Sequence, residues 1–109
     1  MATKKDIEEV FNYWVENCRS TGRKPVLDEK RKRYIDRALG WYPKEDLMTA
    51  IDGVLKSPFH QGENPRNKKY DEITLIVRDA EHVEQFMDLA DAQPVVNAAE
   101  EFLRRHNGT

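Results

Sequence analysis

Residues 5–18, which read KDIEEVFNYWVENC, decide the fold class of this chain. Their apolar side chains recur every three or four residues, which is the spacing of one face of an α-helix. That face comprises Ile7, Val10, Phe11, Trp14, Val15 and Cys18. Thr3 or Asp6 is suited to cap the start of the helix, because a short polar side chain can accept a hydrogen bond from an unpaired backbone N–H there.

The same helical spacing recurs in the next two segments. Asp28 suits the N-cap of the first, Gly40 suits the position just beyond its end, and Pro43 suits the first turn of the second. The apolar faces are Tyr34, Ile35, Ala38 and Leu39, then Leu47, Ala50, Ile51, Val54 and Leu55. Gly53 inside a helix costs about 1 kcal/mol relative to alanine. Its presence therefore predicts a close approach between two helices.

Residues 57–70, SPFHQGENPRNKKY, have no helical or strand period. Their prolines, glycine and asparagines exclude a regular element and predict one long ordered loop, a type of segment that is often functional. After it, Asp71 is expected to cap a short helix over 73–77, although the run ITLIV is also compatible with a strand. We favour the helix because no second strand is available to pair with it.

The remaining segments complete an all-α prediction of five or six short helices. Asp79 is expected to cap a helix whose apolar face is Val83, Phe86, Met87 and Ala90, and a last helix is expected from Val95 to about His106. The 109 residues suit one helical domain over 1–109, with 91–109 as a more loosely attached C-terminal helix. A hydrophobic fraction of 39% is enough for one small core and too high for a disordered chain.

Several classes of protein are excluded or disfavoured by what the sequence lacks. A single cysteine, Cys18, cannot form an internal disulfide framework or a cysteine-based zinc site, and we expect it to pack in the core. No apolar run has the length of a signal peptide or membrane span, so we expect a cytoplasmic protein. No HExxH, GxSxG or Walker-type motif is present, and we therefore expect no enzymatic activity, catalytic residue, metal or cofactor.

Charge is segregated along the chain although the formal net charge is only −2. Residues 19–37 hold eight basic and three acidic residues, a net of +5, whereas residues 79–101 hold seven acidic residues and no lysine or arginine, a net of −7. Any argument for a charged partner must therefore rest on the location of these residues, not on the net charge.

The basic stretch predicts contact with nucleic acid. Lys30, Arg33 and Arg37 share one helix face, where phosphate would offset their mutual repulsion. Two other interpretations are a solvated helix face and pairing with the acidic helix of this chain or of a second copy. In the loop, cations beside Tyr70 suit a single strand, which presents both phosphates and base faces. The candidate nucleic-acid-binding residues are Arg19, Arg23, Lys24, Lys30, Arg33, Arg37, Arg66, Lys68 and Lys69.

A second set of residues is the candidate contact with a protein partner: Trp41, Tyr42, Phe59, His60, Glu81, Glu84 and Asp88. Trp41 and Tyr42 lie at a corner between two helices, where aromatic rings either pack inward or face a partner, and we favour packing. His60 and Glu63 are also compatible with a metal or acid–base site. We instead expect the polar side chains of this loop to bond its own backbone.

Two stretches resemble a module of phage and prophage replication proteins, namely replisome organisers and O-type initiation proteins. They are AIDGVLKSPFHQGEN at 50–64 and YDEITLIVRDA at 70–80, preceded by FNYW at 11–14 and LDEKR at 27–31. The similarity spans roughly residues 7–90. In that family the module usually follows a winged-helix DNA-binding domain, so this chain is expected to be either an excised module or a small free-standing protein.

The resemblance implies a role in phage DNA replication, where such proteins recruit or load the replicative helicase and often bind single-stranded DNA. With the charge pattern, it predicts a non-enzymatic accessory module that binds DNA through the basic helix and loop and contacts the helicase or its loader. The alternative is a free-standing adaptor or inhibitor that binds a host replication protein through its acidic C-terminal face without touching DNA. In either role the protein would act in the cytoplasm of the host cell.

Overall fold

Helix follows helix along residues 3–91, the part of the chain that the computed structural model describes. The helices are α1 (Lys4–Cys18), α2 (Glu29–Leu39), α3 (Lys44–Leu55), α4 (Ile73–Ile76) and α5 (Ala80–Asp91). The predicted all-α class is confirmed, and residues 73–76 of the run ITLIV form the short helix α4, not a strand. The helix expected from Val95 to His106 lies outside the described residues.

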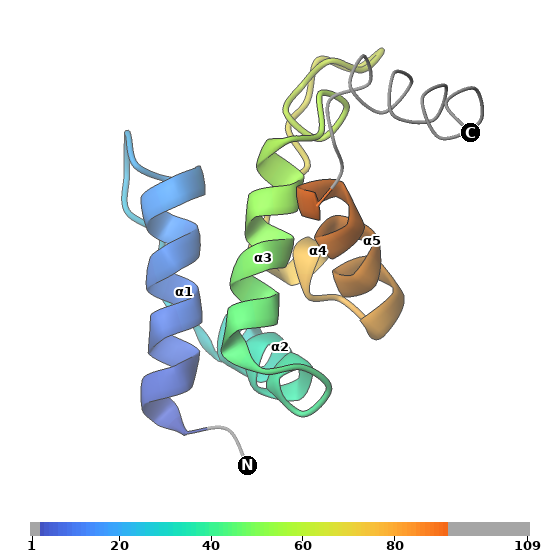
Figure 1. Ribbon diagram of the computed structural model, residues 1–109. Helices are drawn as coiled ribbons and strands as arrows, with labels where there is room; N and C mark the ends of the chain where they lie inside the picture. Colours follow the sequence, from blue (N-terminus) through green and yellow to red (C-terminus); the bar gives the residue numbers. More distant parts are fainter. Residues whose placement is uncertain (1–2, 92–109) are drawn as a thin grey trace, which may run out of the picture.

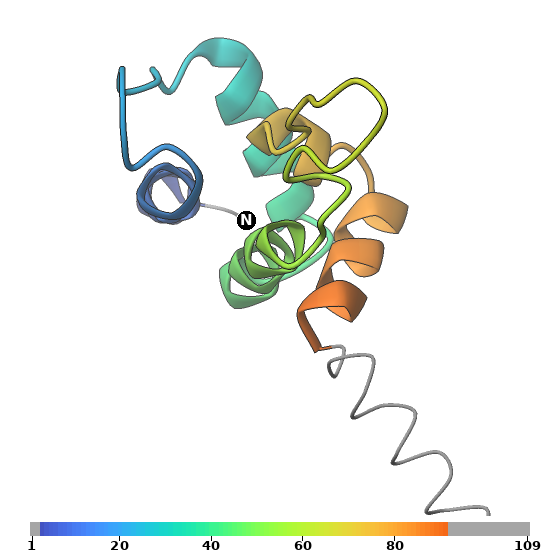
Figure 2. The ribbon, with the colours of Figure 1, turned by 90° about the horizontal axis from the view of Figure 1, so that it is seen from above.

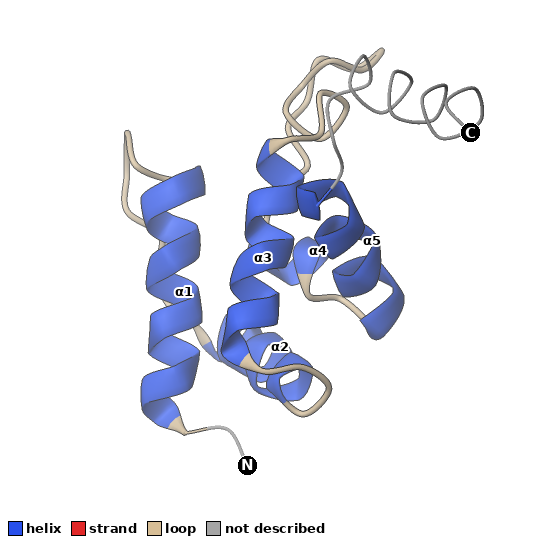
Figure 3. Ribbon diagram, in the orientation of Figure 1, coloured by secondary structure: helices blue, strands red, loops and turns tan. Residues whose placement is uncertain are grey.

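The central helix is α3, which lies between α1 and α5 (Figure 1). Seen from above, α2 and α4 lie together on one side of this row (Figure 2). Two long connections, 19–28 and 56–72, leave the bundle at the end where α1 and α3 finish (Figure 3). Both loops therefore project from one end of the molecule.

The core forms where the apolar helix faces meet. Trp14, Phe86, Ile35, Leu47, Ile51 and Ile76 are among its fully buried side chains. Tyr34, Leu39 and Cys18 are half-buried at its margin. Burial raises the pKa of the Cys18 thiol to about 11, which keeps the thiol protonated at neutral pH and suits a packing role.

Short polar side chains cap three of the helices as the sequence predicts. Thr3 accepts a hydrogen bond from the Asp6 N–H (3.1 Å), Asp28 from the Arg31 N–H (2.8 Å) and Asp79 from the His82 N–H (2.8 Å). These bonds satisfy N–H groups that have no partner within the helix.

The prediction that Asp71 caps α4 is wrong. Glu72 directly precedes this helix and makes no side-chain cap bond. The Asp71 side chain is buried and forms an ion pair with Arg19, with 3.0 Å between Oδ1 and Nη1. A charge removed from water gains more from an opposite charge than from one backbone N–H, so this pairing takes precedence over capping.

Within residues 3–91, every helix is too short or too polar to cross a lipid bilayer.

Candidate nucleic-acid interface

Eight of the nine candidate cations are exposed and form no ion pair with any described residue. They are Arg23, Lys24, Lys30, Arg33, Arg37, Arg66, Lys68 and Lys69. Unpaired surface cations are available to phosphate groups without first breaking an internal ion pair.

Arg19 is the exception, because it contributes to the packing around Trp14. Its guanidinium carbon lies 4.7 Å from the Trp14 ring centre, and that of Arg31 lies 5.3 Å from the same ring. Arg19 pairs with Asp71, and Arg31 pairs with Glu72, with 2.8 Å from Nε to Oε1. Arg19 and Arg31 thus connect α1 and α2 to residues 71–72, which directly precede α4.

Along α2, cations and aromatic rings alternate on one side of the helix. The Lys30 Nζ lies 5.8 Å from the Tyr34 ring centre, and the Arg37 guanidinium carbon lies 4.7 Å from the same ring. Arg37 also lies 5.4 Å from the Trp41 ring. We call Lys30, Tyr34, Arg37 and Trp41 the α2 ladder; the first three lie on α2 at a spacing of three or four residues, and Trp41 lies in the turn just beyond its end.

The position of Trp41 differs from the inward packing that we favoured. The residue is 39% exposed and lies against Arg37 at the surface. Arg37 is held there by a hydrogen bond from its Nη2 to the Arg78 carbonyl oxygen (2.5 Å). The indole therefore keeps part of its surface open to a partner.

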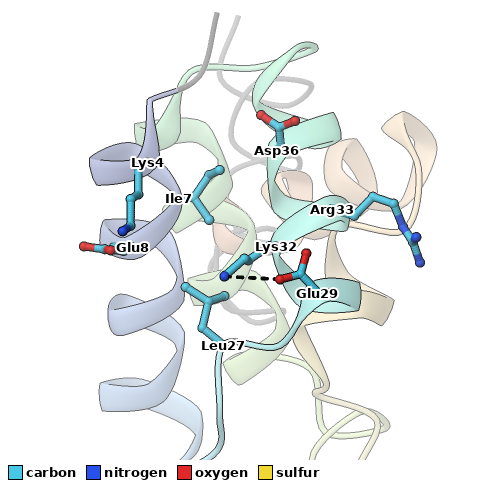
Figure 4. Close-up of a pocket in the computed structure, with 8 residues that line it drawn as sticks. All are labelled: Lys4, Ile7, Glu8, Leu27, Glu29, Lys32, Arg33 and Asp36. Carbon is cyan, nitrogen blue, oxygen red and sulfur yellow. Dashed lines mark hydrogen bonds and ion pairs between the residues drawn. The ribbon is translucent and has the colours of Figure 1, made fainter.

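Arg33 stands apart from the ladder, although sequence spacing places it on the same helix face. It lines a groove between α1 and α2 that also carries Glu29, Lys32 and Asp36, where Lys32 pairs with Glu29 at 3.4 Å. Figure 4 shows the Arg33 guanidinium directed away from α1. The groove has charges of both signs, whereas all the charged members of the ladder are cations.

The loop 57–70 is ordered by its own side chains, as expected. The Asn64 side chain donates to the carbonyl oxygens of Phe59 and Lys68 (both 2.7 Å) and accepts from the N–H groups of Arg66 (3.1 Å) and Lys68 (3.2 Å). Gln61 and Lys69 form an isolated antiparallel bridge. One amide side chain therefore fixes both halves of the loop.

Aromatic rings and a cation gather on this loop. The rings of Phe59 and Tyr70 are stacked, with centres 5.8 Å apart and planes 14° from parallel. The Lys68 Nζ lies 5.9 Å from the Tyr70 ring centre. Phe59 is 52% exposed. We call Phe59, Tyr70 and Lys68, with the neighbouring cations Arg66 and Lys69, the loop cluster.

His60 connects the loop to itself and to α5. Its Nδ1 lies 2.6 Å from the Ser57 hydroxyl oxygen, its carbonyl oxygen accepts from the Tyr70 N–H (2.8 Å), and its ring meets Phe86 edge-to-face at 5.0 Å. Burial, with a smaller effect from His82, lowers the pKa of His60. Within residues 3–91, no cluster of three or more His, Cys, Asp or Glu side chains is arranged to hold a metal ion.

The acidic candidates lie on α5. Glu81, Glu84 and Asp88 are all exposed and form no ion pair among residues 3–91. The half-buried Tyr42 donates its hydroxyl to the Glu84 carboxylate, and this bond raises the pKa of Tyr42 to about 12. Tyr42 thus joins the corner after α2 to the acidic face of α5.

The structure divides the candidate cations into two groups. Arg23, Lys24, Arg66, Lys68 and Lys69 belong to the two loops at one end of the bundle, whereas Lys30, Arg33 and Arg37 belong to α2, which lies lower in the view of Figure 1. Sequence reasoning did not identify the ladder, because it assigned Tyr34 to the core. The spacing 30, 34, 37 and 41 is the signal that would have found it.

Comparison of the chain with protein-family models, with curated protein sequences and with solved structures found no match. The resemblance to phage replication proteins therefore stays a prediction.

Proposed function

We propose that this chain is a non-enzymatic module of phage DNA replication that binds DNA through the α2 ladder. The observation that carries the proposal is the pairing of exposed cations of α2 with aromatic rings. Neither Lys30 nor Arg37 has a carboxylate partner among residues 3–91; Lys30 lies near the Tyr34 ring, and Arg37 lies near the rings of Tyr34 and Trp41. This arrangement matches the chemistry of a nucleic-acid backbone with bases beside it.

Two energetic terms support DNA binding by these cations. Each lysine or arginine that neutralises a phosphate releases condensed counterions, and this release supplies much of the binding free energy at low salt. The ring contacts of Lys30 and Arg37 hold their side chains near the helix, so less rotamer entropy is lost on binding.

Salt titration tests the DNA contact. The full chain is titrated onto fluorescein-labelled DNA over a range of salt concentrations, and binding is followed by anisotropy. Replacing Lys30 and Arg37 with alanine should weaken binding and reduce the slope of log K against log salt by about 2. The matched control is K5A/K32A, which removes the same charge from exposed positions outside the ladder. Equal slopes for the two double variants would overturn the proposal.

The proposed role also includes a protein partner, the replicative helicase or its loader, which the resemblance of residues 7–90 favours. The acidic face of α5, with Tyr42 bonded to its Glu84 carboxylate, is the surface that we assign to it. Purified helicase or loader should be retained by the immobilised chain, and reversal of Glu81, Glu84 and Asp88 to lysine should release it.

A second candidate function, an adaptor or inhibitor that does not touch DNA, is favoured by one observation. Glu81, Glu84 and Asp88 are exposed together on α5 with no cation paired to them in the described part of the chain. Retention of the helicase or loader by the K30A/R37A variant, with no DNA binding by the unaltered chain at low salt, would select this function over the first.

A further inference from the structure

We infer that the loop cluster is a stacking site for a base of single-stranded DNA. The inference rests on the proposed DNA-binding function, which leaves the kind of strand open, and it adds a second contact at the end of the bundle. Phe59, which the sequence assigned to a protein partner, becomes the ring on which the base lies.

Phe59 has two aromatic neighbours and an exposed remainder. Tyr70 is stacked on the Phe59 ring with planes 14° apart, and the His60 ring lies at 73° to the Phe59 ring, with 5.3 Å between the centres of the His60 and Phe59 rings. Despite these two neighbours the residue is still 52% exposed. Every nucleobase has a flat π-face, whatever the DNA sequence. A base can therefore extend the Tyr70–Phe59 stack by one ring.

The surrounding charge selects a polyanion as the occupant of this apolar ring. Arg66, Lys68 and Lys69 are all exposed within eleven residues of Phe59 in the same loop, and none pairs with a carboxylate among residues 3–91. Phosphates that flank a stacked base need cations at such positions. A purely apolar protein surface would offer no charge to these three cations.

The preorganised loop also fits this function. Asn64 ties the Phe59 carbonyl oxygen to the Lys68 carbonyl oxygen, and the Tyr70 N–H is bonded to the His60 carbonyl oxygen, so the loop backbone that carries the ring and the cations is fixed before a strand binds. Rigid presentation lowers the entropy lost on binding. In duplex DNA each base is already stacked between its neighbours, so an exposed ring on a loop gains a stacking partner only from an unpaired strand.

The test compares three fluorescein-labelled ligands of equal length: oligothymidine, an abasic strand and duplex DNA. The full chain should bind oligothymidine more tightly than the abasic strand, which has the same phosphates but no bases. The F59A variant should lose at least about fivefold in affinity for oligothymidine and little for the abasic strand. The F59W variant should keep the preference for oligothymidine, and V26A, which removes another exposed apolar side chain, should behave as the unaltered protein.

The outcomes separate the two proposals. Equal affinity of the unaltered chain for oligothymidine and the abasic strand overturns the stacking site while DNA binding through the ladder stands. The stacking site is also overturned if F59A loses equal affinity for oligothymidine and for the abasic strand, or if F59W no longer prefers oligothymidine. Absence of binding to all three ligands at low salt overturns the DNA-binding function itself, and the stacking site with it.

Discussion

Gly53 of α3 and Phe86 of α5 lie in direct backbone contact. A Cβ atom on Gly53 would lie 1.7 Å from the Phe86 carbonyl oxygen and 2.6 Å from the carbonyl carbon. The close helix approach predicted from a glycine inside a helix is therefore confirmed. Because the opposing atoms belong to the backbone, no side chain can rotate to make room for a methyl group.

Replacement of Gly53 with alanine should lower the free energy of unfolding by about 3 kcal/mol, since overpacking at a backbone contact outweighs the gain in helix propensity. Gly40→Ala is the control: Gly40 has a right-handed φ of −74°, and a Cβ there would lie 3.1 Å from the Arg37 carbonyl oxygen. It should change stability far less. Urea unfolding followed by circular dichroism measures both, and equal effects would contradict the contact.

The pair formed by Asp71 and Arg19 should matter more for stability than the exposed ion pairs. Asp71→Asn keeps the size of the buried side chain but removes its charge, and it should cost about 2 kcal/mol. The comparison is Glu29→Gln, which breaks the exposed pair with Lys32 and should cost less than about 0.5 kcal/mol. Thermal unfolding of the two variants at one pH measures both losses, and equal losses would contradict the prediction.

The helices could be predicted because their information is local. The recurrence of Ile7, Val10, Phe11 and Trp14 places one face inward regardless of what covers it, and Asp28 caps a helix within its own turn. Asp71 could not be placed in the same way, because its partner lies far away along the chain. Likewise Gly40 follows α2 as predicted, but the chain turns there without the left-handed conformation that a glycine allows.

Alkaline pH should destabilise the protein partly through Tyr13. The hydrogen bond that it donates to Asp52 (2.6 Å) raises the pKa of Tyr13 to about 12, compared with about 10 in an unfolded chain. Between these values the folded state retains a proton that the unfolded state has lost, so stability falls as pH rises. Tyr13→Phe should flatten this fall. Midpoints of thermal unfolding from pH 9 to 12 test it, and parallel curves for both proteins would contradict it.

Order in the loop 57–70 should depend on Asn64. Its side chain makes four hydrogen bonds to the loop backbone, so Asn64→Ala should open the loop and speed tryptic cleavage after Arg66, Lys68 and Lys69. Asn12→Ala, at an exposed position on α1, should leave cleavage there unchanged. Mass spectrometry of early digestion products identifies the sites. Equal rates in both variants would mean that the loop is fixed by other contacts.

Tryptophan fluorescence should report on the ladder. Trp14 is fully buried and donates to the Asp71 carbonyl oxygen (2.7 Å), whereas Trp41 is 39% exposed. DNA bound at the ladder should therefore quench Trp41 alone. Trp41→Phe should abolish quenching by DNA while leaving the emission of Trp14. Quenching of similar size in this variant would place the DNA elsewhere.

The candidate site was less predictable than the fold, because charge along the chain says little about which cations remain unpaired. Arg19 and Lys30 look alike in the sequence, yet Arg19 lies on Trp14 beside a buried carboxylate and Lys30 lies on Tyr34 at the surface. The two cations differ in the aromatic ring that each contacts, and the burial of that ring depends on tertiary packing. Ring stacking between Phe59 and Tyr70, across eleven positions of an irregular loop, likewise has no periodic signal.

Phe86 is shared by parts of the molecule to which we assign different partners. Its carbonyl touches α3, and its ring meets both His60 under the loop and His82 on α5. Substitutions at these inner positions are expected to disturb the proposed DNA contact and the proposed helicase contact together. Variants that separate the two proposed contacts should instead be sought at exposed positions, Phe59 for the DNA contact and Asp88 for the protein contact.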